Sequence, residues 1–318
     1  MQQRIVNNCE LLGKSWQLLK QNFKWDSSEI SLGAAAIYTT LGLEPDIAKM
    51  TECRQILKSS EGLFSEFRGM AEIIVLCKMA LTANPQQYLE NLKITRDALS
   101  AGKLFSTEYQ LLAALSICDN AAGEEAVRYA EKTLECYKKM KQAHPFLTAG
   151  EDYPFAALLA LSPRSTEIVM DDVEQCFTLL KQYFGSNDPV QTLSHVLALS
   201  DAPAASKTAA CTNLFEVLKK NGQKFGQSYD LTALGCMALT GADPQMLTEL
   251  FITADEHLKA QKGFSGLLGV STMTRRLLAA HVVTTTLAPG NLVCSSVAIN
   301  QIVQILNISQ TDTSIALM

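Results

Sequence analysis

Hydrophobic and polar residues follow two patterns along this chain, and the two patterns alternate. The first is a short run that is apolar on all sides, as in AEIIVLCKMAL (71–81) and YPFAALLALS (153–162). The second is longer and amphipathic, as in TEIVMDDVEQCFTLLKQYF (166–184). Its apolar residues recur at helical spacing and share one stripe, formed by Val169, Val173, Cys176, Phe177 and Leu180. The alternation predicts pairs of helices, in which the apolar helix must be covered on more than one side.

Phenylalanines and prolines mark the period of this alternation. Seven phenylalanines are separated by 41, 41, 41, 38, 41 and 39 residues: Phe23, Phe64, Phe105, Phe146, Phe184, Phe225 and Phe264. Out of phase with them lie Pro45, Pro85, Pro163, Pro203 and Pro244. Two breakers in each period of about 40 residues divide every unit into two helices, which predicts stacked helical hairpins. We expect five of the phenylalanines to occupy equivalent buried positions between hairpins: Phe64, Phe105, Phe146, Phe225 and Phe264.

The fold class is all-α, with about seven helical hairpins at a period of about 40 residues. An open α/α superhelix, or solenoid, is the first arrangement that fits, and a closed α/α toroid is the alternative. With no linker rich in Gly, Pro or Ser, residues 1–318 form one repeat domain. Residues 1–22 are expected as an N-terminal cap helix, 23–287 as hairpin repeats, and 288–318 as a C-terminal cap helix and tail.

Composition and charge exclude several classes of protein. The chain has 27 basic and 32 acidic residues and no basic cluster, so a nucleic-acid partner is not expected. Residues 277–311 contain no Asp, Glu, Lys or Arg, but Pro289 and Gly290 interrupt them, and neither half offers the roughly 18 apolar residues of a membrane span. We expect no membrane association. The segment could instead be a buried cap or a surface for self-association.

The first residues, MQQRIVNNCELLGKSW, lack the apolar core of a signal peptide, which favours a cytoplasmic protein. The nine cysteines include no CxxC pair, and their number is odd. They are therefore neither a disulfide framework nor a zinc motif. We expect them to be reduced and mostly buried, as small core residues.

Several strings resemble a bacterial family known only as a domain of unknown function. They are FSEFRG (64–69), HPFLTAGEDYPFAALLALS (144–162), LSHVLALS (193–200) and KAQKGF (259–264). The resemblance covers most of residues 10–285, and its most distinctive piece is the HPxLT…DYP string. It implies a cytoplasmic bacterial protein and carries no activity that could be transferred to this chain.

Four candidate site residues cluster around the fourth and fifth units. His144, Asp152 and Tyr153 share one loop and helix start, and His195 lies in the next apolar helix. A functional interpretation makes His144 and Asp152 an acid–base or metal-ligating pair, joined by His195, with Tyr153 in a pocket wall. In the structural interpretation the acids favour a helix N-terminus, His144 caps the preceding helix, and His195 is a hydrogen-bonded core residue.

Arg68, at a loop-to-helix junction, is a further candidate. It could hold a neighbouring turn or grip a ligand carboxylate. Arg68, His144, Asp152, Tyr153 and His195 are thus the candidate ligand-binding residues.

Two functions remain open. The first is a non-catalytic repeat protein that presents a groove to a protein or peptide partner. The second is an α/α-toroid enzyme with a site near His144, Asp152 and His195. Its apolar ALxAL helices resemble the repeats of prenyltransferase and terpene-cyclase toroids, yet no corresponding metal-binding motif stands out. No phosphate loop, GxSxG or HExxH string is present in a usable context, so we expect neither a metal nor a cofactor. Whether the chain is an enzyme stays open, and self-association through residues 277–311 is a further possibility.

Overall fold

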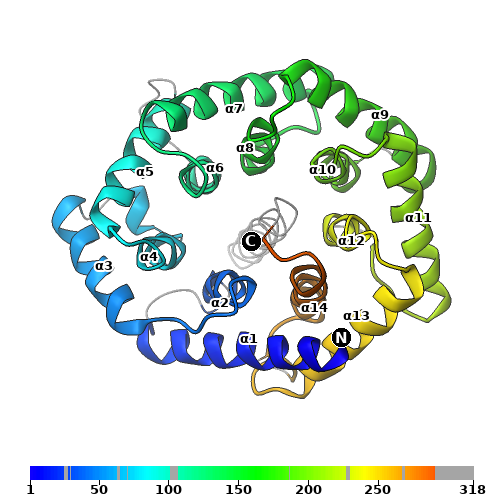
Figure 1. Cartoon of the computed structure of the whole chain (residues 1–318), viewed down its shortest axis with the longest axis horizontal. Coiled ribbons are helices and arrows are strands. Elements are labelled where there is room, and N and C mark those ends of the chain that lie inside the picture. Colours follow the sequence, from blue (N-terminus) through cyan, green and yellow to red (C-terminus); the bar gives the residue numbers. More distant parts are fainter. Residues whose placement is uncertain are drawn as a thin grey trace, which may run out of the picture.

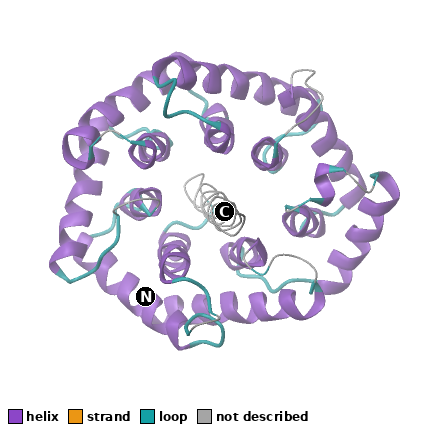
Figure 2. Ribbon diagram, turned by 180° about the vertical axis from the view of Figure 1, so that it is seen from behind, coloured by secondary structure: helices purple, strands orange, loops and turns teal. Residues whose placement is uncertain are grey.

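The computed structural model describes residues 1–24, 28, 30–62, 65–69, 71–100, 107–185, 187–226, 230–266 and 269–290. In these residues it is all-α, and its fourteen α-helices alternate between an outer and an inner ring (Figure 1). The view from behind shows the same two rings (Figure 2). The predicted all-α array of helical hairpins is therefore confirmed.

The inner ring is built from the short apolar helices. They are α2 (Ile30–Thr40), α4 (Glu72–Ala80), α6 (Glu108–Cys118), α8 (Tyr153–Ala160), α10 (Asp188–Leu197), α12 (Leu231–Ala238) and α14 (Thr272–Leu287). Every residue of α12 is buried, and so is every residue of α8 after Tyr153. Inner neighbours cover each helix on its sides and outer helices cover it from behind, so a polar face would gain no contact with water.

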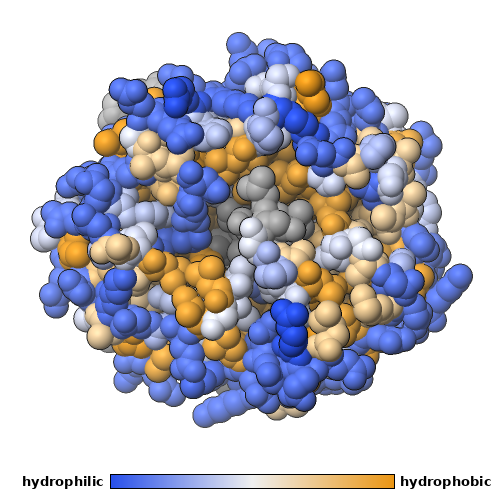
Figure 3. Space-filling model, in the orientation of Figure 1, coloured by the Kyte–Doolittle hydropathy of each residue, from blue (hydrophilic) through white to orange (hydrophobic). Residues whose placement is uncertain are grey.

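The outer ring is built from the amphipathic helices. They are α1 (Gln2–Asn22), α3 (Ile47–Ser60), α5 (Pro85–Ser100), α7 (Glu124–Ala143), α9 (Thr166–Phe184), α11 (Ala204–Lys220) and α13 (Pro244–Ala260). In α9 all five residues of the predicted stripe are buried, and the opposite face is exposed. Hydrophilic residues accordingly dominate the periphery of the molecule (Figure 3).

The two ends of the described chain close the ring. Helix α1 contacts α2, α13 and α14, so it is the outer partner of α14 and has no open end to cap. At this seam the Trp16 and Phe264 rings meet edge to face with their centroids 4.9 Å apart, and the Gln17 side chain donates a hydrogen bond of 3.0 Å to the carbonyl of Lys262. The chain is the closed toroid that we gave as the alternative, and the open superhelix is wrong.

The topology gives the ring two different faces. Loops that lead from an outer to an inner helix, such as 144–152 and 221–226, lie at the end where the inner helices begin. Loops that lead from an inner to an outer helix, such as 81–84 and 161–165, gather at the other end. We call these the long-loop face and the short-loop face.

The seven regularly spaced phenylalanines, which we call the phenylalanine ladder, occupy equivalent positions in the structure only in part. Phe225 and Phe264 are buried as predicted, and Phe64 and Phe105 lie outside the described residues. Phe146 is 99% exposed, so the prediction that it is buried is wrong. The reason is a difference in register: Phe146 follows the end of α7 by three residues, whereas Phe225 follows the end of α11 by five. In the loop after α7 the fifth residue is Thr148, which is buried.

The cysteines agree with their predicted role. Eight of them lie in the described part of the chain, all eight are free, and all but Cys118 are buried, while Cys294 lies outside it. None of the described helices combines the length and the apolar character needed to cross a membrane. Residues 277–286, the described core of the charge-free segment, lie in α14 and are either buried within the ring or nearly so, and residues 291–311 lie outside the described chain.

Candidate functional site

The fold brings two of the candidate residues into direct proximity. Asp152 ends the short 3-10 helix η2 (Gly150–Asp152) and precedes α8, and His195 lies near the end of α10, which contacts α8. The Nδ1 atom of His195 is 3.5 Å from Oδ1 of Asp152. Asp152 is 2% exposed and His195 is 1% exposed, so both side chains are shielded from water.

Few hydrogen bonds compensate for this burial. Oδ2 of Asp152 accepts a bond of 2.9 Å from the amide of Ala149, which ties the loop to the start of α8. Both ring nitrogens of His195 are buried without a hydrogen-bond partner among the described residues, because the contact with Asp152 lacks hydrogen-bonding geometry. Burial without a partner disfavours the charged form of either side chain.

The protonation of the pair follows from this environment. Burial raises the pKa of Asp152 from 3.8 to about 7, and the carboxylates of Glu151 and Asp188 add to the rise, while the Ala149 amide and Lys141 oppose it. Burial lowers the pKa of His195 from 6.5 to about 3, with a smaller contribution from His144. The environment therefore favours a neutral imidazole beside a carboxyl group that titrates near neutral pH.

The two shifts have opposite consequences for stability. Because the pKa of Asp152 is raised on folding, its contribution is fully present below about pH 4 and is lost as the pH rises towards 7. Because the pKa of His195 is lowered, its contribution is present above about pH 6.5 and is lost as the pH falls towards 3. Between about pH 4 and 6.5 the two effects offset each other.

A buried polar chain lies beside the pair. The Gln191 side chain, one turn before His195 in α10, donates a hydrogen bond of 2.7 Å to the hydroxyl of Thr148. That hydroxyl in turn donates to the carbonyl of Met140 in α7, at 3.1 Å. These bonds fasten the loop between α7 and α8 to α10 on one side and to α7 on the other.

His144 and Tyr153 point to other partners. Nε2 of His144 lies 3.0 Å from both carboxylate oxygens of Glu174 in α9, at the edge of the ring. Its imidazole also contacts the Phe177 ring, with centroids 4.4 Å apart. Tyr153 stacks on Tyr137 with centroids 3.9 Å apart. His144 therefore connects two outer helices and does not complete an acid–base pair with Asp152.

Arg68 lies in a different part of the ring. It ends η1 (Glu66–Arg68), which contacts α4, and its Nη1 atom donates a hydrogen bond of 3.4 Å to the carbonyl of Glu61. The arginine thus holds a neighbouring turn, one of the two roles that its position suggested.

The burial of Asp152 and His195 limits the chemistry that this pair can perform. A reacting acid or base must meet its substrate, and an active site opens onto a pocket. Both side chains are almost fully buried, and among the described residues no group of three or more His, Cys, Asp or Glu side chains is placed to hold a metal ion. We therefore assign the pair to the scaffold that positions the loop before α8.

That loop carries a residue that the sequence placed in the core. Phe146 lies at its tip with 99% of its surface exposed, the largest exposure among the large hydrophobic residues of the described chain. The only signal in the sequence is the interval to the next phenylalanine of the ladder, 38 residues in place of 41. Such an interval marks a change in register but does not say which ring becomes exposed.

The loop holds Phe146 in place through several hydrogen bonds. The ammonium group of Lys141 donates to the carbonyls of Pro145 and Thr148, at 2.7 and 2.6 Å. The amides of Leu147 and Thr148 donate to the carbonyl of His144, at 3.2 and 2.9 Å. The exposed ring therefore projects from a fixed backbone.

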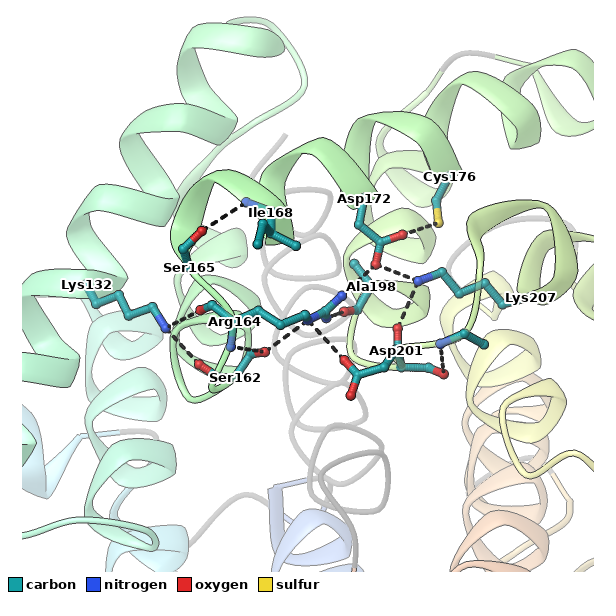
Figure 4. Close-up of polar contacts among 12 residues, drawn as sticks. Lys132, Ser162, Arg164, Ser165, Ile168, Asp172, Cys176, Ala198, Asp201 and Lys207 are labelled. Atoms are coloured by element: carbon teal, nitrogen blue, oxygen red, sulfur yellow. Dashed lines mark hydrogen bonds and ion pairs between the residues drawn. The ribbon is translucent and has the colours of Figure 1, made fainter.

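A cluster of charged side chains joins Arg164, Asp172, Asp201 and Lys207 on the short-loop face (Figure 4). Asp172 in α9 accepts hydrogen bonds from Arg164, at 3.0 Å, and from Lys207 in α11, at 2.6 Å. Lys207 also donates to the carbonyl of Ser200, and Arg164 pairs with Asp201 at 3.0 Å. Cations and carboxylates thus satisfy one another here, and the cluster joins two short loops to two outer helices.

The side chain of an outer helix also holds the next short loop at other places in the ring. Lys49 donates to the carbonyl of Thr82, and the Asn91 side chain donates to the carbonyl of Ala121, both one unit further along. Lys132 donates to the carbonyl of Ser162 in the same way. The charged cluster of Figure 4 is a more elaborate form of this contact between units and is structural.

Comparisons with known proteins find a relative and a family, both of unknown function. The uncharacterized protein YeaA of Bacillus subtilis (strain 168) is 22% identical over 253 residues, which cover 77% of this chain and 75% of that protein. No solved structure matches the chain significantly. The family model described as "Protein of unknown function (DUF4003)" matches residues 15–311. Since this match spans nearly the whole ring, the chain belongs to the DUF4003 family.

Proposed function

We propose that this chain is a non-catalytic binding protein that holds a protein partner against the long-loop face of its ring, with Phe146 as the anchor. The observation that carries this proposal is the 99% exposure of Phe146 on a loop tied down by hydrogen bonds. A closed ring does not offer the open concave surface of a superhelix, so the binding surface is a loop face.

The energetics of an exposed phenylalanine support this role. Burying such a side chain is worth about 1.5–3 kcal/mol, and a ring left in water gives the folded chain none of this. Aromatic residues are enriched among the few interface positions that carry most of the binding energy. Because the loop is already fixed, a partner does not have to order it on binding.

The catalytic alternative has weaker support. It requires access to Asp152 and His195, and both are buried. The neighbouring His144 is engaged by Glu174 and Phe177. The binding role needs no such access, because its central residue already lies in solvent.

The test is site-specific photocrosslinking in the cells from which the chain comes. The photoreactive residue p-benzoylphenylalanine replaces Phe146 in one variant and Ile94 in the control, since Ile94 is also exposed but lies in the middle of α5, on neither loop face. We expect a discrete crosslinked adduct of defined mass from position 146 and none from the control position. Equal, diffuse labelling from both positions, or none from position 146, would refute the proposal.

A further inference from the structure

The two faces of the ring carry charges of opposite sign. On the long-loop face, the last turns of all the outer helices except α5 carry exposed lysines: Lys20, Lys58, Lys141, Lys181, Lys219, Lys220 and Lys259. On the short-loop face, the first turns and preceding loops carry exposed acids: Glu44, Asp46, Asp119, Glu124, Glu125, Glu167, Asp201 and Asp243. Four of them, Glu44, Asp119, Glu167 and Asp201, pair with a lysine or an arginine. Each set stabilises the helix ends that it flanks. Because every outer helix begins at the short-loop face and ends at the long-loop face, the local preference adds up to a basic and an acidic face.

Exposed apolar side chains accompany the charges on both faces. The acidic face exposes Leu41, Leu43 and Ile168, and the basic face exposes Phe146 and Tyr183. Tyr183 lies in the last turn of α9, the outer helix that follows α7. Both faces thus combine apolar anchors with charges of a single dominant sign, as complementary halves of one interface do.

We infer that the partner bound at Phe146 is a second copy of this chain, which presents its acidic short-loop face to the basic long-loop face of the first. This inference rests on the proposed function and names its partner. Charge selects the arrangement: two basic faces repel each other, two acidic faces do the same, and only the head-to-tail contact pairs opposite charges. Such a contact is heterologous, and each added copy leaves one face of each kind free.

The experiment is sedimentation velocity on the purified full chain over a series of concentrations, at low and at high ionic strength. Wild-type chain is expected to associate at low ionic strength and to dissociate near 1 M salt, where screening limits electrostatic attraction to about 3 Å. Phe146→Ala is expected to weaken the association about 30-fold, as the loss of an interface anchor does. Phe146 is fully exposed, so this variant keeps its fold.

Two blocked variants distinguish a head-to-tail contact from a symmetric one. The first carries Phe146→Ala and Lys181→Glu on the basic face, and the second carries Leu43→Ala and Glu44→Lys on the acidic face. Each alone is expected to be monomeric, and an equal mixture is expected to form a dimer and nothing larger, because only one intact face of each kind remains. A blocked variant that still associates by itself would overturn the head-to-tail arrangement.

The other possible occupants of the basic face give different results. Wild-type chain that stays monomeric under all conditions, yet crosslinks from position 146 to a different protein, would overturn this inference and leave the proposed function standing. Monomeric chain that floats with vesicles containing phosphatidylglycerol would make a lipid surface the occupant and overturn both. Association without any crosslink from position 146 to a second copy would also overturn the inference.

Discussion

Two phenylalanines of the same ladder should respond in opposite ways to the same substitution. Phe264 is fully buried at the seam of the ring, where its ring meets that of Trp16 edge to face. Replacing it with alanine removes the transfer free energy of the ring and leaves a cavity, which costs about 3–5 kcal/mol. The lost aromatic pair accounts for about 1 kcal/mol of this loss. Phe146 makes no comparable contacts, so Phe146→Ala should change the free energy of unfolding by less than about 0.5 kcal/mol.

The measurement is equilibrium urea denaturation of wild type and the two variants, followed by far-UV circular dichroism. Phe225→Ala serves as a second control, because Phe225 is equally buried, against Phe251, but lies away from the seam. We expect Phe225→Ala and Phe264→Ala to lower the free energy of unfolding by similar amounts. A loss for Phe146→Ala as large as that for Phe264→Ala would show that the described loop is not the one in solution.

Three further predictions follow from the buried polar groups. In Asp152→Asn only the effect of His195 remains, so the free energy of unfolding should rise with pH between about 4 and 6.5. In His195→Gln only the effect of Asp152 remains, so the free energy of unfolding should fall between about pH 4 and 7. Thermal melts across this range check both signs, and parallel profiles for the two variants would contradict them. Asp172→Ala should cost about 3–5 kcal/mol because it leaves the buried ammonium of Lys207 uncompensated, and adding Lys207→Met should recover part of this loss in the same denaturation assay. The buried cysteines should resist thiol reagents at pH 8 until denaturant is added, since burial raises the pKa of Cys9 and Cys77 to about 12; rapid labelling of five or more thiols in the native protein would contradict this.

Local patterns were enough to predict the two kinds of helix. A run such as YPFAALLALS has no polar side, and that is enough to place it inside a second layer of helices. The stripe of α9 likewise predicted which of its residues face inward. In both cases the prediction needs only the spacing of apolar residues within about twenty residues of chain, which is the length of a single helix.

Closure of the ring could not be predicted in the same way. It depends on contacts such as that between Gln17 and Lys262, which are 245 residues apart in the sequence. A small change in the rotation between successive hairpins would open the ring into a superhelix with the same local pattern. The candidate site shows a similar limit: the repeat register brought Asp152 and His195 together, but the sequence did not reveal that the pair would be buried or that Phe146 would be exposed.

Closure also determines where a partner can bind. In an open array the terminal hairpins expose their apolar sides and must be capped, whereas here α1 completes the pair with α14 and no hairpin has a free side. The outer wall consists of the polar faces of amphipathic helices, and the rim of the ring is accordingly mostly hydrophilic (Figure 3). The surfaces that remain for a partner are the two loop faces. They differ in charge because every outer helix runs from the short-loop face to the long-loop face. A ring with one basic and one acidic face can pair with its own copy only in one orientation, so the order in which the chain alternates outer and inner helices sets both the fold and the polarity of any assembly built from it.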